Sequence, residues 1–265
     1  MPPAESVPLL AVDGLTKRFG GVVALSGYAI RVAAGELIGL IGPNGAGKTT
    51  VLNLLTGVTR PSEGRIVFRG EDITGQRADR FTARGIARTF QNIRLFRDLT
   101  VLDNVTAALH LRHGPALASA VLALPAARRA ERRMAARGLE LLDLFALADR
   151  AQARARDLPY GEQRKVEIAR ALATEPRLLL LDEPAAGMNP AETRHLMDVI
   201  RAVHDALSLT ILVVEHDMSL IMGLCGRVQV INRGEVLADG APAQVQADPA
   251  VIEAYLGTRR ARAGA

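Results

Sequence analysis

The sequence predicts an α/β fold built on a parallel sheet that helices cover on both faces. The main observation is a pair of continuous apolar strands, Leu178–Leu181 and Ile211–Val214, preceded by helical patterns over Gly161–Ala173 and Ala191–Leu207. Strands without polar alternation are typical of parallel sheets buried on both sides. The 265 residues are 49% hydrophobic and 23% charged, which excludes a disordered, collagen-like or disulfide-scaffold protein.

The first part of the chain is predicted to form short strands. They are expected at Leu9–Asp13, Tyr28–Val32 and Leu37–Ile41, separated by glycines and polar residues. A helix is expected over Lys48–Thr56, followed by a strand over Arg65–Phe68. No internal repeat or low-complexity linker separates these segments, so we expect one α/β core.

The middle of the chain has a different composition. Ala, Leu and Arg dominate from about Val101 to Leu147, and leucines at positions 139, 142 and 147 have helical spacing. This pattern predicts a helical insertion near residues 92–165 within the core.

We expect a cytosolic protein without a membrane span. The longest uncharged apolar stretch that is not an obvious strand, Gly114–Ala127, has 14 residues, whereas a transmembrane helix needs about 20. Residues Met1–Pro8 lack the basic-then-apolar pattern of a secretory signal. The single cysteine, Cys225, cannot form an internal disulfide, which suits a reducing compartment.

The chain is basic, with a formal net charge of +5 and a pI near 10.0. Its arginines scatter along the sequence, apart from runs at Arg128–Arg137 and Arg259–Arg262. Scattered arginines indicate a bias in composition more than a continuous basic surface that binds nucleic acid. We therefore expect no nucleic-acid partner, and an anionic membrane surface is the better candidate.

Residues Gly42–Thr50, with the sequence GPNGAGKTT, fit the pattern G-x-x-x-x-G-K-[ST] between a predicted strand and a predicted helix. About 0.002 matches are expected by chance at this composition. The glycines let backbone N–H groups surround phosphates, and the following helix directs its positive end at them. Lys48 adds a charge and Thr49 a hydroxyl ligand for Mg²⁺. The sequence therefore predicts a nucleoside-triphosphate site.

Two carboxylates, Asp182 and Glu183, end a buried apolar strand. Ligands bind at the carboxyl ends of parallel strands, and alternation directs the two side chains differently. We expect Asp182 to serve the Mg²⁺ shell and Glu183 to polarise the attacking water.

His216 ends the next apolar strand, Ile211–Val214 plus Glu215, which is predicted to lie beside the Asp182 strand. A histidine here has two interpretations of equal weight. It is either structural or exposed without function, or it senses the γ-phosphate of the nucleotide.

In motif content the chain resembles the ATPase subunits of ATP-binding-cassette transporters over nearly its whole length. Six segments carry the resemblance in the family's order: Lys17–Gly20, the phosphate loop, Thr89–Asn92, Leu158–Arg164, the Asp182–Glu183 pair and Val214–Asp217. The resemblance implies a nucleotide-binding core over residues 1–91 and 166–265, with N-terminal antiparallel strands and a C-terminal tail. It also implies a helical subdomain over residues 92–165 that carries the signature.

The resemblance also implies roles for individual residues. Phe19 would stack on adenine, Gln91 would reach the Mg²⁺ and the attacking water, and His216 would act as the switch histidine. The signature would contact the γ-phosphate of a nucleotide held by a second subunit. The implied catalytic residues are Glu183, His216 and Gln91, and the implied metal ligands are Thr49, Gln91 and Asp182. The implied ATP contacts are Phe19, Gly42, Pro43, Asn44, Gly45, Ala46, Gly47, Lys48, Thr49, Thr50, Tyr160, Gly161 and Glu162.

The signature departs from the family's usual Leu-Ser-Gly-Gly-Gln, because Pro159 and Tyr160 replace the serine and the first glycine. Proline offers neither a hydroxyl nor a backbone N–H, so the γ-phosphate would lose two donors. The usual Ser-Ala-Leu-Asp of the D-loop is replaced within Ala185–Pro190, where Asn189 keeps hydrogen bonding without the charge.

In these departures the chain resembles one subfamily, the glycine-series ATPases of high-affinity branched-chain amino acid importers. The segments Ala87–Phe96 and Pro249–Gly257 resemble it too. The resemblance implies a second ATPase, as a homodimer or heterodimer, two permeases and indirectly a periplasmic binding protein, at the cytoplasmic face of the membrane. The insertion would dock onto a permease. Its run Arg128–Arg137 is better explained as solvent-exposed, and the tail Arg259–Arg262 is expected to be disordered.

Two alternatives are less well supported. The ATPase of a lipid or lipopolysaccharide exporter tends to keep the serine-glycine-glycine signature and a shorter insertion. A soluble, non-transport cassette protein usually carries two cassettes or a long coiled coil, whereas one phosphate loop and no sustained heptad run are present. Substrate specificity of such importers resides in other subunits, so no residue of this chain would contact the transported molecule.

Overall fold

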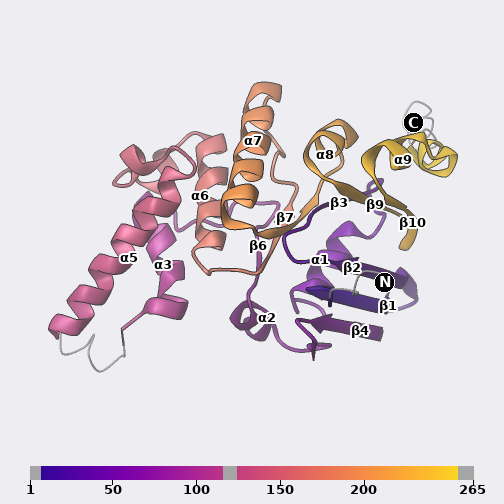
Figure 1. Ribbon diagram of the computed structural model, residues 1–265, viewed down its shortest axis with the longest axis horizontal. Helices are drawn as coiled ribbons and strands as arrows, with labels where there is room; N and C mark the ends of the chain where they lie inside the picture. The colour runs from indigo at the N-terminus through magenta and orange to yellow at the C-terminus, as the bar shows by residue number, and fades with distance from the viewer. Residues whose placement is uncertain (1–6, 116–123, 256–265) are drawn as a thin grey trace, which may run out of the picture.

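A computed structural model describes residues 7–115 and 124–255 of the chain (Figure 1). The strands are β1 (Leu10–Phe19), β2 (Val22–Val32), β3 (Leu37–Ile41), β4 (Glu63–Phe68), β5 (Glu71–Asp72), β6 (Ile86–Arg88), β7 (Leu178–Asp182), β8 (Thr210–Val214), β9 (Arg227–Asn232) and β10 (Glu235–Gly240). The helices are α1 (Lys48–Leu55), α2 (Ala78–Arg84), α3 (Val101–His113), α5 (Pro125–Asp143), α6 (Tyr160–Leu172), α7 (Pro190–Leu207), α8 (Met218–Leu224) and α9 (Pro242–Ala247). Two 3₁₀ turns, η1 (Ala148–Arg150) and η2 (Ala155–Asp157), precede α6.

The central sheet has six strands in the order β10-β9-β3-β8-β7-β6. Strands β9, β3, β8, β7 and β6 pair in parallel, and β10 is antiparallel to β9. The predicted parallel sheet is therefore confirmed. So is the prediction that the strand before His216 lies beside the Asp182 strand, since Asp182 pairs with Val214.

The N-terminal strands form a second sheet, antiparallel, in the order β2-β1-β4-β5. The N-terminal antiparallel strands implied by the family resemblance are confirmed. Strands β1 and β2 are longer than the sequence predicts, because they continue as a twisted ribbon through glycines and exposed polar residues. In such a ribbon the hydrogen-bonded ladder, not a hydrophobic face, holds the strand ends together.

Alternation along the parallel strands divides the hydrophobic core into two layers. Leu179 and Leu181 face a layer that includes buried residues of α6, α7 and α8. Leu178 and Leu180 face the other layer, with α1 and the antiparallel sheet. Because successive side chains of a strand point to opposite faces, an all-leucine strand fills both layers at once.

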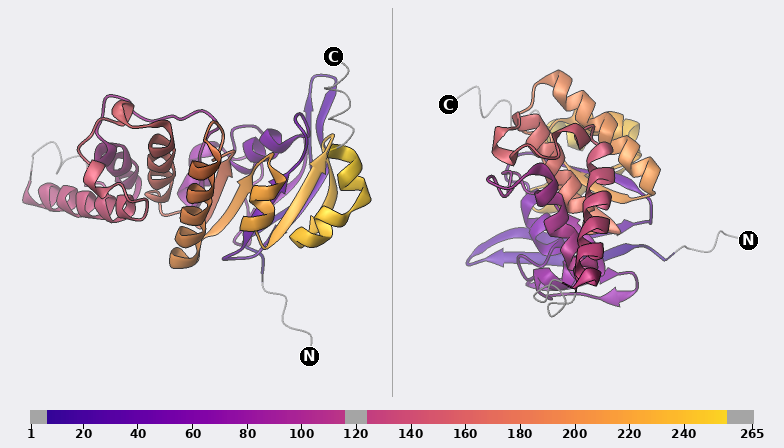
Figure 2. Two further views of the ribbon diagram at one scale, coloured as in Figure 1. Left: turned by 90° about the horizontal axis from the view of Figure 1, so that it is seen from above. Right: turned by 90° about the vertical axis from the view of Figure 1, so that its left-hand side faces the viewer.

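Residues 92–165 carry α3, α5, the two 3₁₀ turns and the start of α6 (Figures 1 and 2). Helices α3 and α5 lie at the end of the molecule opposite to β10 and α9, and they pack closely where Gly138 faces Leu102. The arginines of the run Arg128–Arg137 are exposed on α5, as predicted. That residues 92–165 form a separate subdomain remains a prediction.

Some sequence predictions concern residues outside the described ranges. They include the first six residues, most of the apolar stretch Gly114–Ala127 and the basic tail Arg259–Arg262. Within residues 7–115 and 124–255, no helix is both long and apolar enough to cross a membrane.

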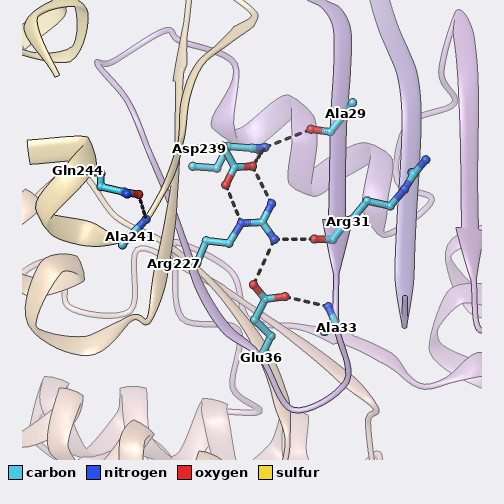
Figure 3. Close-up of polar contacts among 9 residues, drawn as sticks. Ala29, Arg31, Ala33, Glu36, Arg227, Asp239, Ala241 and Gln244 are labelled. Carbon is cyan, nitrogen blue, oxygen red and sulfur yellow. Dashed lines mark hydrogen bonds and ion pairs between the residues drawn. The ribbon is translucent and has the colours of Figure 1, made fainter. Parts of the chain in front are cut away.

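A polar cluster around Arg227 joins the two sheets (Figure 3). The Arg227 guanidinium forms a bidentate ion pair with Asp239, at 2.6 and 2.7 Å, and also pairs with Glu36. It donates to the carbonyl oxygen of Arg31 on β2 at 2.8 Å, and Gln229 donates to the carbonyl of Ala29 on the same strand. These bonds fix β9 and β10 against the antiparallel sheet, an attachment that strand patterning did not predict.

Candidate functional site

The phosphate loop lies between β3 and α1, as predicted. Gly47 precedes α1 with φ 109°, in the left-handed region, and a Cβ there would lie 3.0 Å from the carbonyl oxygen of Ala24. A Cβ on Gly42 would lie only 2.2 Å from the carbonyl oxygen of Ile231. A larger side chain is excluded at Gly47 by backbone strain and at Gly42 by lack of space. The loop can therefore expose its N–H groups at the start of the helix.

Lys48 is 7% exposed, and its ammonium donates to the carbonyl oxygens of Gly42 and Pro43 at 2.7 and 3.1 Å. Burial lowers the pKa of Lys48, and the nearby carboxylates of Glu183 and Asp182 oppose that shift. The carbonyl oxygens of the loop thus hold the Lys48 ammonium in place. The positive charge lies close to the space that an anion would enter.

A cavity of about 780 Å³ opens above the phosphate loop. A volume of this size accommodates a nucleotide-sized ligand. It is lined by Val22, Val23, Ala24, Asn44, Gly45, Ala46, Gly47, Lys48, Thr49, Thr50, Gln91, Glu183, His216 and Arg233. Residues far apart in sequence, namely the phosphate loop, Gln91, Glu183 and His216, are brought together here as predicted. Arg233, from the turn between β9 and β10, was missed because a single arginine in a turn has no motif to identify it.

Glu183 is the meeting point of the three predicted catalytic side chains. The Gln91 amide donates to Glu183 Oε2 at 3.0 Å, and His216 Nδ1 lies 3.9 Å from the same oxygen. Glu183 has φ 45°, a left-handed conformation that costs a non-glycine residue roughly 1–2 kcal/mol. Glu183 lines the cavity, whereas Asp182 stays in register with β8, opposite Val214.

Asp182 is 5% exposed and forms an ion pair with Arg88 of β6 at 2.7 Å. The same guanidinium donates to the Asn53 side chain at 2.7 Å, and Thr89 Oγ1 accepts from the Asp182 N–H. Arg88 was not predicted as a site residue. Its position next to Thr89 in a known motif segment was the available signal, but only sheet pairing shows that β6 lies beside β7.

Glu215 is a further carboxylate near the site, in addition to Asp182 and Glu183, and it was not predicted as a site residue. It is 1% exposed, accepts a hydrogen bond from the N–H of Ala185 at 3.0 Å, and lies 3.8 Å from His216. Burial raises the pKa of Glu215. It attaches the segment after Glu183 to the end of β8, so that it positions both Glu183 and His216.

The signature residues Tyr160, Gly161 and Glu162 form the first turn of α6, with Pro159 as its N-cap and no side-chain cap. None of the three lines the cavity formed by the described residues. Tyr160 packs on the D-loop, since a Cβ on Gly187 would lie 3.3 Å from its ring. In the same D-loop, Asn189 caps α7 by accepting from the N–H groups of Ala191 and Glu192.

Arg164 connects the signature helix to the Gln91 segment. Its side chain is fully buried and donates to the carbonyl oxygens of Phe90 and Gln91, both at 2.7 Å. It also pairs with Glu167 at 2.8 Å and donates to the Tyr160 hydroxyl at 3.0 Å. Burial raises the pKa of Glu167. Arg164 lies in the predicted signature segment Leu158–Arg164, but its place in the sequence did not predict this link.

Phe19 lies at the end of β1 and is half exposed, with the ammonium of Lys17 4.9 Å from its ring centre. Its ring is not among the described residues that line the cavity. An exposed aromatic face near the end of the site is compatible with stacking on a flat ligand.

These features, a phosphate loop beside two strand-end carboxylates with a glutamine and a histidine, define a nucleoside-triphosphatase site. The family model for ABC transporters matches residues 25–186, and a second model, for branched-chain amino acid ATP-binding cassette transporters, matches residues 235–261. The chain belongs to the ABC transporter family and is an ATPase of that class.

Individual relatives sharpen the comparison. The chain is 44% identical over 252 residues to the high-affinity branched-chain amino acid transport ATP-binding protein LivG of Escherichia coli K12, covering 95% of this chain and 99% of that protein. It is similar to the ADP conformation of MJ1267, an ATP-binding cassette of an ABC transporter, with a TM-score of 0.83, 30% identity and coverage of 95% and 100%. It is also similar to the dimeric post-hydrolysis state of the cassette MJ0796 bound to ADP and Pi, with a TM-score of 0.74, 25% identity and coverage of 88% and 98%.

Proposed function

We propose that this chain is the ATP-hydrolysing subunit of an importer for branched-chain amino acids. The observation that carries the proposal is the convergence of Gln91, Glu183 and His216 at the mouth of the phosphate-loop cavity. The match of residues 235–261 to the branched-chain amino acid family model and the 44% identity to LivG support the substrate class.

Each predicted site residue at or near the cavity has a role in this proposal. The phosphate loop, Gly42–Thr50, binds the phosphates, and Lys48 neutralises the β- and γ-phosphate charge. Glu183 accepts the proton of the attacking water as general base. Gln91 orients that water through its bond to Glu183, and His216 contacts the γ-phosphate. Phe19 stacks on the adenine.

The site also suits Mg²⁺, because the Thr49 hydroxyl and the Gln91 amide oxygen belong to residues that line the cavity. The third predicted ligand, Asp182, is buried with one carboxylate oxygen paired with Arg88, so it would serve the ion through its other oxygen. Mg²⁺ prefers such oxygen donors together with substrate phosphates. The Gln91 amide donates to Glu183 through its nitrogen, which leaves its oxygen available. When bound, the ion neutralises charge that develops on the phosphates.

The proposed working unit contains two ATPase subunits. Tyr160, Gly161 and Glu162 lie outside the cavity of their own chain, so they are available to the nucleotide of a second subunit. The dimeric state of MJ0796 bound to ADP and Pi supports this arrangement. The bound nucleotide would then join two subunits, since it contacts the phosphate loop of one and the signature of the other.

The proposed permease contact is a groove of about 340 Å³ between α3, α6 and the segment after Gln91. Two large apolar residues of its lining, Phe96 and Leu111, are 55% and 68% exposed. The groove is close to the catalytic segment, because Arg94 donates its backbone N–H to Glu167, which pairs with Arg164. An apolar helix end of a permease fits such a groove. The chain would thus lie at the cytoplasmic face of the membrane as a peripheral subunit, with a periplasmic binding protein as an indirect partner.

The hydrolysis role of Glu183 is tested by Glu183→Gln. We expect ATP hydrolysis to fall by about 10²–10⁴-fold, the usual contribution of a general base, while ATP binding persists and ATP-loaded dimers accumulate. Turnover measurements and size-exclusion chromatography with ATP report both effects. Glu131→Gln, an equal charge change on the exposed face of α5, serves as the control. Undiminished turnover would remove the assigned role.

The transport role is tested by purifying the tagged chain from its native membranes in a mild detergent and identifying the chains that co-purify. Two permeases and a second, different ATPase would support the importer. Recovery with lipid-export partners, or with ribosomes and no membrane protein, would contradict it.

A further inference from the structure

A second cavity, of about 630 Å³, lies at the edge of the parallel sheet opposite to the nucleotide cavity. Its lining includes residues one or two positions before β6, β7 and β8, namely Arg84, Arg177 and Leu209. The phosphate loop and Glu183 follow the other ends of parallel strands. The two cavities therefore lie at opposite ends of the parallel strands and share no lining residue.

Positive charge dominates this cavity, which we call the basic cleft. Two glutamates line it, Glu71 and Glu175. Both already have cationic or ionisable partners, because Glu71 pairs with Arg84 at 3.2 Å and Glu175 contacts His113 at 2.8 Å. The arginines of the lining are Arg69, Arg84, Arg112, Arg137 and Arg177.

Two of these arginines have unused hydrogen-bonding capacity. Among the described residues, no hydrogen bond, ion pair or ring contact involves the side chain of Arg69 or Arg177. Within the same described ranges, the Arg112 side chain forms one hydrogen bond, from its Nε to the carbonyl oxygen of Thr174. Guanidinium groups that converge without carboxylate partners repel one another, and an anion with several oxygens relieves that repulsion.

We propose that the basic cleft binds a small soluble anion carrying several phosphate groups. Arginine is suited to this ligand because its planar fork donates two parallel hydrogen bonds to one phosphate. The cleft has the volume of a small-molecule site, and Leu141, Leu172 and Pro176 give its floor an apolar part. Arg84 and Arg137 already pair with Glu71 and Glu140, at 3.2 and 2.7 Å. The guanidinium groups left for the ligand are those of Arg69, Arg112 and Arg177, and an anion with one charge would not neutralise all three.

The arginines come from two separate parts of the chain. Arg112 and Arg137 belong to α3 and α5, whereas Arg69 follows β4 and Arg84 ends α2. A ligand held by both groups bridges the helical insertion and the sheet. Binding therefore raises the free energy of unfolding by an amount that grows with ligand concentration.

The test is isothermal titration of the protein with inorganic tripolyphosphate. Because the phosphate loop also binds polyphosphate, the titration is done with wild type and with Lys48→Ala, which disables that loop. We expect binding to persist in Lys48→Ala, and to weaken by about tenfold or more when Arg69→Ala and Arg177→Ala are added, as loss of charge-assisted bonds predicts. The melting temperature of Lys48→Ala should also rise with tripolyphosphate only while both arginines are present.

The matched control adds Arg132→Ala and Arg133→Ala to Lys48→Ala, an equal change of charge on the exposed face of α5. It should bind tripolyphosphate as Lys48→Ala does. Equal weakening by both pairs of substitutions would show general attraction to a basic protein and overturn the proposal. Loss of all binding in Lys48→Ala would overturn it as well. Sedimentation with phosphatidylglycerol vesicles that depends on Arg69 and Arg177, without tripolyphosphate binding, would replace the soluble ligand with a lipid headgroup.

Discussion

The phosphate loop and the signature segment both lie at a helix N-terminus, but they are constructed differently. The loop is complete within nine consecutive residues, Gly42–Thr50, and its lysine is held by carbonyls of the same loop. The signature helix α6 lacks a capping side chain, as α1 does. It is positioned by distant contacts, through Arg164 to the Gln91 segment and through Tyr160 to the D-loop.

The difference shows that one half of the site is locally determined and the other depends on packing. Glycine conformations and hydrogen bonds within a few residues are encoded by neighbouring side chains. The signature helix follows no comparable loop, so residues from other parts of the chain determine its position.

The largest effect should come from breaking the link behind the signature with Arg164→Ala. The Glu167 carboxylate, 2% exposed, would lose its partner, and removing one member of a buried ion pair costs about 3–5 kcal/mol. Urea unfolding measures the change. Adding Glu167→Leu to the variant should recover part of the loss, because the unpaired carboxylate is then gone. A single variant destabilised by less than about 1 kcal/mol would show that packing alone positions the signature.

The phosphate loop is tested by Lys48→Ala. Loss of its charge-assisted bonds to phosphate should weaken ATP binding by about a hundredfold, as measured with a fluorescent ATP analogue. Lys165→Ala, an equal charge change within the signature helix, should leave the affinity of the isolated chain unchanged. Tight ATP binding by Lys48→Ala would contradict the assignment of the loop.

The smallest effect should come from Pro159→Ser, which restores a hydroxyl and an N–H at the signature. One or two added hydrogen bonds to the γ-phosphate should lower the ATP concentration needed for subunit association by about fivefold. ATP affinity of the single chain should not change, because in the proposed dimer the signature contacts the partner's nucleotide. Analytical ultracentrifugation at increasing ATP measures the association, with Pro242→Ser as the control. An unchanged midpoint would mean that this signature does not contact the γ-phosphate.

Much of the fold was predictable because its signals are local. Strand β3 has the predicted bounds, and α1, α6, α7, β7 and β8 begin and end within one residue of them. The strands β6, β9 and β10 were not predicted, since β6 has three residues and β10 alternates weakly at an edge. Such strands are defined by the neighbour they pair with, not by their own pattern.

The sequence by itself determined the chemistry of the site. The loop Gly42–Thr50 and the pair Asp182 and Glu183 could be predicted because these motifs keep their phosphate and metal residues at fixed local spacing. The role of His216 was predicted only from the family resemblance. Only the tertiary structure decided how these residues are held. It placed Arg88 on Asp182, Arg164 beneath the Gln91 segment and five arginines around the basic cleft. The physical reason is that ion pairs and clefts are formed by residues distant in the chain, and no local period or propensity encodes their approach.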